Sequence, residues 1–193
     1  YTNDKTCLII DPGCYFPEEK QKLKAFIASN DLKVERLLLT HCHLDHVFGN
    51  SFIYKEYGIE PEYHELDEPT MKMAPISANM YNIPGFEPSP PVRSYLKEGQ
   101  TLKLGSEEFE IRFCPGHAPG HVVFIHHNQR IVIGGDVIFR VSIGRTDLPG
   151  GNHATLIQSI KEQILTLPED YTIYSGHGDT TTVGNEKKHN PFL

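Results

Sequence analysis

The sequence predicts an α+β fold in which helices cover the outer faces of β-sheets. Its two halves follow the same order, in which apolar strand-like runs are followed by segments with apolar residues on one helical face. Such a pattern favours sheets covered by helices. The 193 residues suffice for one domain, 1–193. A domain of this size buries roughly 70% of the surface of its unfolded chain.

The first half begins with an apolar strand, 7–10, that runs into the turn sequence Asp11-Pro12-Gly13. We expect this strand to pair in a sheet and its hairpin partner to precede Tyr1. Pro17 suits the first turn of a helix, and the later helices show apolar residues one turn apart. Four prolines and a glycine in 82–91 favour a loop. The other elements expected in this half are strands at 34–39 and 59–64 and helices over 17–29, 47–57 and 67–80.

The second half consists mostly of short expected strands. Every second residue from Phe109 to Phe113 is apolar, which indicates a strand covered on one face. The segment 152–167 has one apolar helical face, and Thr182 or Asn185 is a suitable N-cap for a terminal helix. The strands expected in this half are 101–104, 109–113, 121–125, 130–133 and, as the last one, 171–174.

The densest group of functional residues is Thr40-His41-Cys42-His43-Leu44-Asp45-His46, which follows the strand at 34–39. Residues two apart on extended backbone project to the same side, so His41 and His43 can bind one metal ion together. Asp45 and His46, around the following bend, can face a second ion. Imidazole and carboxylate groups are ligands for zinc, iron or manganese. Cys42 lies between two ligands, and its side chain should point away from the metal.

Composition excludes several classes of function. The formal net charge is -7, with acidic and basic residues interspersed, which argues against a nucleic-acid partner. No apolar run approaches the ~20 residues needed to span a membrane, so we expect no membrane partner. The four cysteines show no paired spacing, which favours free thiols in a reducing compartment and a cytoplasmic location.

Three later strands also run into ligand-type residues beside glycine, which permits close backbone approach. A histidine or aspartate in such a turn is, taken alone, usually an ordinary loop residue. Their coincidence with the first cluster, each after a predicted strand, indicates a functional site. The segments are Pro115-Gly116-His117 with His121, Gly134-Gly135-Asp136, and Gly176-His177-Gly178.

In order and spacing these residues resemble the metallo-β-lactamase superfamily. In detail they are similar to glyoxalase II, hydroxyacylglutathione hydrolase, and especially to its short single-domain bacterial relatives. Further segments that resemble this branch are Ile10-Asp11-Pro12-Gly13, the run from Ile143 to Gly151, and Asn190-Pro191-Phe192-Leu193. The resemblance covers essentially the whole chain and implies a four-layer αββα sandwich with a dinuclear metal site at one edge of the two sheets.

The same resemblance implies two divalent metal ions, with zinc as the first choice and iron or manganese as alternatives. Among the ligands, Asp45 and Asp136 would also count as catalytic. The activity implied is hydrolysis of a small 2-hydroxyacyl-glutathione thioester by a metal-bridging hydroxide. The implied ligands are His41, His43 and His117 for the first ion, Asp45, His46 and His177 for the second, and Asp136 bridging the two.

Three other residues have supporting or substrate-binding roles in this interpretation. Asp11 resembles a residue that supports the ligand loop, and His121 matches no ligand position, so it either supports a ligand or is structural. Arg145 either binds an anionic substrate or pairs with Asp147.

Two rival functions remain open on the sequence. Persulfide dioxygenases share the fold and the first motif but hold a single iron, so metal count and identity separate them from a hydrolase. A non-catalytic binding module of this fold would be expected to have lost ligands, and none is missing here.

Overall fold

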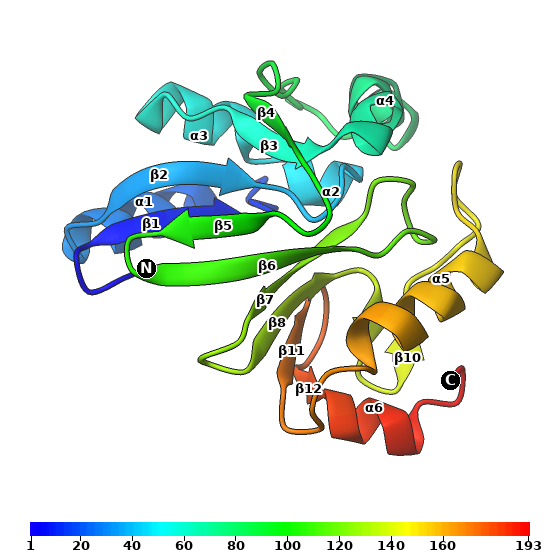
Figure 1. Cartoon of the computed structure of the whole chain (residues 1–193). Coiled ribbons are helices and arrows are strands. Elements are labelled where there is room, and N and C mark those ends of the chain that lie inside the picture. Colours follow the sequence, from blue (N-terminus) through cyan, green and yellow to red (C-terminus); the bar gives the residue numbers. More distant parts are fainter. The chain divides into compact units, whose positions relative to one another are not determined.

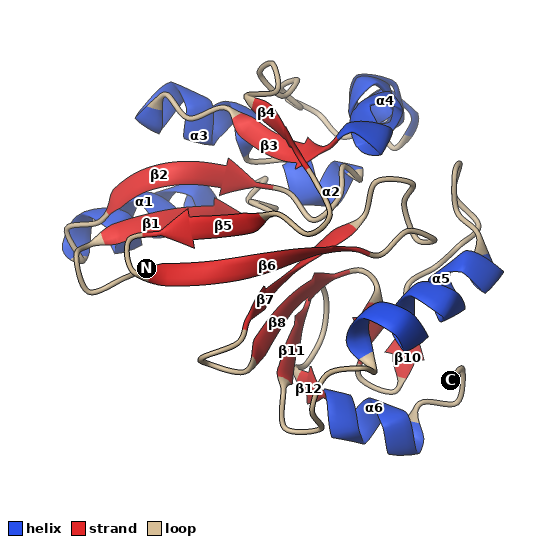
Figure 2. Ribbon diagram, in the orientation of Figure 1, coloured by secondary structure: helices blue, strands red, loops and turns tan.

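The computed structural model describes residues 1–193, and its contacts divide the chain into two compact units. Unit 1 contains residues 1–95 and 103–107, and unit 2 contains residues 96–102 and 108–193. Figure 1 follows the chain in colour from blue to red, and Figure 2 shows that both units combine strands with helices. The α+β class predicted from the sequence is therefore confirmed.

Unit 1 is built on a four-stranded sheet. Its elements are β1 (Thr6–Ile10), α1 (Pro17–Ser29), β2 (Lys33–Leu38), α2 (Leu44–Val47), α3 (Asn50–Tyr57), β3 (Pro61–His64), η1 (Glu65–Asp67), α4 (Glu68–Met80) and β4 (Ser94–Leu96). The strand order is β1-β2-β3-β4, and β2 pairs parallel with both β1 and β3. Parallel pairing requires a crossover between strands, and the helices supply it. Apolar residues such as Cys7, Ile27, Leu37 and Ile53 form a core cluster from β1, α1, β2 and α3.

The helix expected over 47–57 was wrong in its bounds. The chain is already helical in α2, bends at Gly49, and continues as α3. The Gly49 N–H donates to the Pro12 carbonyl at 2.7 Å, and a Cβ at Gly49 would lie 2.5 Å from that oxygen. The break thus accommodates the loop after β1, a tertiary contact that no local pattern reveals. As a consequence Asp45 and His46 lie on a short helix rather than on a bend.

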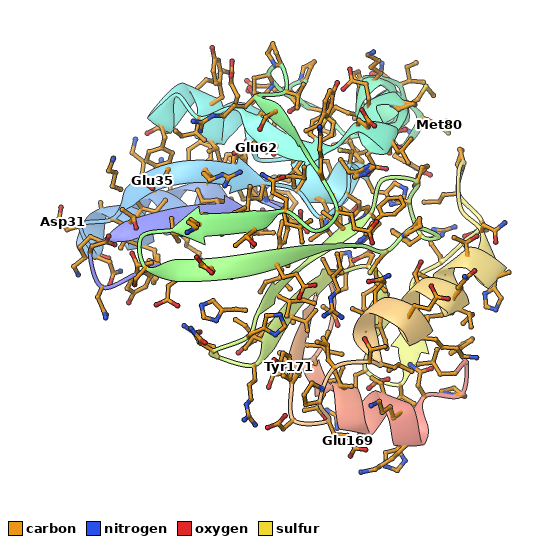
Figure 3. The ribbon with its side chains drawn as sticks, viewed as in Figure 1. Asp31, Glu35, Glu62, Met80, Glu169 and Tyr171 are labelled. Atoms are coloured by element: carbon orange, nitrogen blue, oxygen red, sulfur yellow. The ribbon has the colours of Figure 1, made fainter.

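A buried ion pair joins two strands of this sheet. Figure 3 labels Glu62 on β3, where its side chain is 4% exposed. Arg36 on β2 donates to both carboxylate oxygens of Glu62, at 2.8 and 2.6 Å, and Ser94 on β4 donates at 2.6 Å. Burial alone raises the pKa of Glu62, but these donors outweigh it and lower the pKa below its usual value. Glu62 is therefore a charged tie across the sheet.

Unit 2 contains most of a six-stranded sheet and a two-stranded hairpin. Its elements, with β5 and β6 carrying the chain between the units, are β5 (Thr101–Leu104), β6 (Glu107–Phe113), β7 (Val122–His126), β8 (Ile131–Gly135), β9 (Ile138–Phe139), β10 (Ser142–Ile143), α5 (His153–Ser159), η2 (Ile160–Ile164), β11 (Thr172–Ser175), β12 (Thr181–Thr182) and α6 (Val183–His189). The larger sheet has the order β12-β11-β8-β7-β6-β5. Its core includes Val123, Ile125, Leu156, Ile160 and Ile173.

Two details of unit 2 differ from the prediction. The helix expected over 152–167 is α-helical only in α5 and continues as the wider π-type turn η2. The strand at 171–174 is not the last one, because the short β12 pairs antiparallel with β11. The Thr182 side chain accepts the Asn185 N–H at 3.1 Å and caps α6, so the first of the two suggested caps is the one used.

The cysteines are free thiols, as predicted. Cys7, Cys42 and Cys114 are buried, and Cys14 is half-buried. No helix of the structure has both the length and the apolar character needed to cross a membrane.

Candidate metal centre

The first part of the candidate site lies directly after β2. His41 is fully buried and His43 is half-buried, and their rings meet edge-on with centroids 4.8 Å apart. Between them Cys42 turns the other way, into an apolar cluster with Val47 and Tyr63. The backbone here is therefore extended enough for alternate residues to share a side.

Cys42 is protonated and unsuited to bind metal in this position. Burial raises the pKa of its thiol well above the usual value, and the nearby carboxylate of Asp67 raises it further. The Asp67 carboxylate also accepts the Cys42 N–H at 2.7 Å. This bond anchors the backbone between the two histidines to the start of α4.

The second pair of expected ligands lies on α2. The His46 ring is 4.1 Å from the His41 ring, measured between centroids. The Asp45 side chain is 49% exposed, and its Oδ2 lies 3.7 Å from His46 Nε2. Unit 1 thus brings its four expected ligands, His41, His43, Asp45 and His46, to one place.

Asp11 holds the rear nitrogens of two of these histidines through a hydrogen-bond chain. Its Oδ2 accepts the Thr40 hydroxyl at 2.6 Å. The Thr40 Oγ1 lies 3.0 Å from His41 Nδ1, and because its own hydrogen is donated to Asp11 it must accept a hydrogen bond from the Nδ1–H. The same Oδ2 lies 3.1 Å from His46 Nδ1, which must also donate because a carboxylate only accepts. Both rings therefore carry the proton on Nδ1 and present the Nε2 lone pair, which is the form that binds a metal.

The backbone of the Asp11 loop is fitted to this task. Asp11 has φ 47°, in the left-handed region, and its Oδ1 accepts the Thr40 N–H at 2.7 Å. A Cβ at Gly13 would lie 2.7 Å from the Asp45 carbonyl oxygen. The loop after β1 is thus packed directly against the start of α2. The sequence suggested a supporting role for Asp11 but gave Thr40 none, although a hydroxyl residue next to a ligand histidine is a usable signal.

A second group of expected ligands lies in unit 2. The Oδ2 of Asp136, after β8, is 3.7 Å from the Nε2 of His117 and 3.6 Å from the Nε2 of His177. Asp136 and His117 are buried, and the His177 side chain is 56% exposed. His121 is fully buried, and its Nε2 accepts the Asp136 N–H at 3.0 Å. His121 thus positions the backbone of Asp136.

The segment after β10 supports His117 from behind. The Arg145 carbonyl oxygen lies 2.8 Å from His117 Nδ1, and a carbonyl only accepts, so this ring also carries its proton on Nδ1. Gly144 packs tightly against the Asp136 backbone and the His117 ring. A Cβ at Gly144 would lie 1.9 Å from the Asp136 carbonyl oxygen and 3.1 Å from His117 Nδ1. The close approach explains why glycine precedes Arg145.

The Arg145 side chain makes a separate ion pair. Its Nε and a terminal nitrogen donate to the two carboxylate oxygens of Asp147, each at 2.7 Å. This pairing lowers the pKa of Asp147 to about 2. The structure therefore contains the Arg145–Asp147 tie that the sequence offered as one of two alternatives.

A buried carboxylate fixes the β9–β10 hairpin that joins Asp136 to Gly144. Glu186 on α6 is fully buried and accepts the Val141 N–H at 3.0 Å and the Asn190 side-chain amide at 2.8 Å. The same Asn190 amide donates to the Ser142 carbonyl at 2.9 Å. The C-terminal segment thereby secures the turn of the hairpin.

The residues present fit a metal centre. The ligand groups of unit 1 and of unit 2 each offer imidazole and carboxylate groups, and three of the imidazoles have their Nε2 lone pairs fixed by bonds at Nδ1. In unit 1 the ligand atoms of Asp11, His41 and His46 lie within 4.8 Å of one another. In unit 2 Asp136 stands nearly equidistant from two histidines. This donor chemistry suits zinc, iron or manganese.

Comparison with known proteins places these observations in a family. The family model described as the metallo-β-lactamase superfamily matches residues 1–177. The chain is 41% identical to the hydroxyacylglutathione hydrolase GloC of Haemophilus influenzae, over all of this chain and 90% of that protein. The expectation of a metallo-β-lactamase fold is thereby confirmed.

Solved structures agree with this match. The crystal structure of the BLEG-1 B3 metallo-β-lactamase superposes with a TM-score of 0.87 at 34% identity, covering 100% of this chain and 91% of that one. The structure of TTHA1623 in a di-iron-bound form gives a TM-score of 0.84 at 38% identity, covering 95% of this chain and 88% of that one. The chain belongs to the metallo-β-lactamase superfamily.

Proposed function

We propose that this chain is a metal-dependent hydrolase that cleaves a small thioester of the 2-hydroxyacyl-glutathione type. The supporting similarity is the 41% identity to a hydroxyacylglutathione hydrolase along the whole chain. Other members of the superfamily differ in activity, so the substrate class is part of the proposal. A small-molecule substrate also agrees with the net charge of -7, because nucleic-acid partners favour a basic surface.

The ligand assignment follows the resemblance of the motifs. His41, His43 and His117 would hold one divalent ion, and Asp45, His46 and His177 the other, with Asp136 shared between them. When bound, a pair of divalent ions lowers the pKa of a coordinated water and polarises the thioester carbonyl. Zinc is the first expectation, and the di-iron form of a 38% identical relative makes iron the second.

The single observation that carries the proposal is the hydrogen bonding behind the histidines. Asp11, directly and through Thr40, keeps protons on Nδ1 of His46 and His41, and the Arg145 carbonyl does so for His117. Each ring is held in one tautomer and one orientation by the protein itself. Hydrogen bonds of this kind at the second ring nitrogen are expected of histidines that bind metal, because they fix the tautomer and the orientation of the ring.

The experiment loads metal-free protein separately with zinc, iron and manganese. Each sample is tested for lactoylglutathione hydrolysis and for oxygen uptake with glutathione persulfide. We expect thioester hydrolysis that is lost in Asp136→Ala and retained in Asp170→Asn, a control at an exposed carboxylate paired with Arg130. Oxygen uptake with iron, and no hydrolysis with any of the three metals, would favour a persulfide dioxygenase with mononuclear iron.

A further inference from the structure

Four aromatic side chains of unit 1 form a connected row next to the ligand loop. We call this row the aromatic rim, and it consists of Tyr15, Phe16, Phe48 and Phe86. The Tyr15 ring lies 4.9 Å from Phe16 and 5.1 Å from Phe48, and Phe48 lies 6.3 Å from Phe86, measured between centroids. These separations are typical of favourable aromatic contacts. The rim thus links the loop after β1 to the loop 82–91.

The rim lies beside an expected metal ligand. Phe48 follows Asp45 by three residues and still has helical φ and ψ, -52° and -36°, so the two side chains project on the same side of α2. The Asp45 carboxylate is half exposed rather than enclosed. Gly13 packs against the Asp45 carbonyl oxygen, and Tyr15 and Phe16 follow it closely in the chain. A group held at Asp45 therefore has Phe48 of the rim as its neighbour.

The rim is held in place yet remains partly open to solvent. The Glu19 carboxylate accepts the N–H groups of Tyr15 and Phe16 at 2.9 and 2.8 Å, and the Tyr15 hydroxyl donates to the Pro84 carbonyl. Phe86 packs against the buried cluster that contains Cys42 and Val47. Nevertheless Phe16 is 57% exposed, and the other three rings are half-buried. Burial in the core alone does not account for this arrangement.

The rings of the rim are uncharged, and the charged groups around them already have partners. The Glu19 carboxylate accepts from the backbone of Tyr15 and Phe16, and Lys20 acts electrostatically on Cys14 and Glu87. Glu87 accepts from Lys55 at 2.7 Å and from Ser51 at 2.8 Å, while Asp11 serves Thr40 and His46. The rim therefore offers apolar ring faces, and the apolar side chain of a 2-hydroxyacyl group would gain from contact with them.

We infer that the aromatic rim binds the acyl group of the substrate and gives the enzyme a preference for aromatic or large apolar acyl groups over lactoyl. The inference rests on the thioester hydrolase proposed above. A phenyl ring placed against fixed aromatic side chains buries more apolar area than a methyl group, and hydrophobic contacts discriminate between such substrates by roughly 10–200-fold.

The test compares kcat/KM for mandeloylglutathione, which carries a phenyl group, with kcat/KM for lactoylglutathione, which carries a methyl group. We expect the wild type to prefer the phenyl substrate by at least about tenfold. Phe48→Ala should lower this ratio by about tenfold, chiefly through KM, because the contact is made in the ground state as well. Phe48→Leu, which keeps apolar volume, should retain part of the preference. Phe26→Ala is the control, since Phe26 on α1 is 51% exposed and contacts the ring of Tyr1.

A binding measurement separates failure of this inference from failure of the hydrolase proposal. Metal-loaded protein is titrated calorimetrically with mandelate and with lactate, which requires no turnover. Tighter binding of mandelate by the wild type, lost in Phe48→Ala, supports the inference even if no thioester is cleaved. Equal binding of both acids by the wild type, or an equal loss of both in Phe48→Ala, overturns it and leaves the rim a structural feature.

Discussion

Replacing Asp11 with alanine tests the support behind the first group of histidines. The change removes an acceptor that is 12% exposed and receives the Thr40 N–H, the Thr40 hydroxyl and the His46 Nδ1–H at 2.7, 2.6 and 3.1 Å. Hydrogen bonds to a charged group contribute about 1.5–3 kcal/mol each. The two bonds from Thr40 alone therefore predict a loss of about 3 kcal/mol or more in the free energy of unfolding of the metal-free protein.

The same substitution should weaken metal binding. Without the carboxylate, neither His41 nor His46 is held in the tautomer that presents Nε2, and loss of such a partner costs about 10–100-fold in affinity. Urea unfolding of the metal-free protein measures the first effect, and zinc titration against a competing chelator measures the second.

Asp31→Ala is a matched control for the backbone. Asp31 is exposed and has φ 54°, close to the 47° of Asp11, so alanine meets the same left-handed conformation without losing a buried network. The role assigned to Asp11 would be refuted if the free energies of unfolding of Asp11→Ala and Asp31→Ala differed by less than about 1 kcal/mol and Asp11→Ala bound zinc with wild-type affinity. In that case the hydrogen bonds from Asp11 would not be what orients His41 and His46 for metal binding.

Three further predictions concern other parts of the chain. Glu62→Gln should cost about 3 kcal/mol at neutral pH by leaving its arginine partner unpaired, measured by urea unfolding. The pKa of Glu62 is lowered in the folded state, so its charge stabilises the fold at pH values above its unfolded-state pKa of about 4.3. The difference in unfolding free energy between wild type and Glu62→Gln should shrink as the pH falls below that value towards the folded-state pKa. Gly144→Ala should displace the Asp136 carbonyl and reduce kcat/KM about 100-fold, while Gly99→Ala, which meets nothing within 4 Å, should cost stability through its positive φ of 73° and leave kcat/KM unchanged. A thiol reagent should label at most Cys14 in the native protein and all four cysteines after unfolding; rapid labelling of a second thiol would contradict the burial described.

Local sequence signals predicted the long elements of the fold well. The helix over 17–29 was predicted at its observed bounds, because Pro17 is pre-organised for a first turn and the following residues favour helix. The strands β9, β10 and β12 were not predicted, because two residues carry no periodic signal. The interruption at Gly49 depends on the approach of Pro12, which is distant in sequence.

The candidate site shows the same division. Ligand-type residues beside glycines at strand ends were visible in the sequence, since metal chemistry restricts the residue types that can serve. The parts played by Thr40 and Gly144 were not predicted. The Thr40 hydroxyl donates to the Asp11 carboxylate and accepts from His41, and the backbone of Gly144 packs against the Asp136 carbonyl. Both contacts exist only in the folded chain.

The most direct test of the proposed dinuclear hydrolase is activity measured against metal equivalents. Metal-free protein is titrated with zinc, and with iron in a parallel series, while lactoylglutathione hydrolysis and bound metal are recorded on the same samples. We predict that hydrolysis continues to rise until two equivalents are bound per chain, and that Asp136→Ala binds fewer and does not reach the same rate. Saturation at one equivalent of iron, with oxygen consumed on persulfide and no thioester cleaved, would contradict the dinuclear hydrolase.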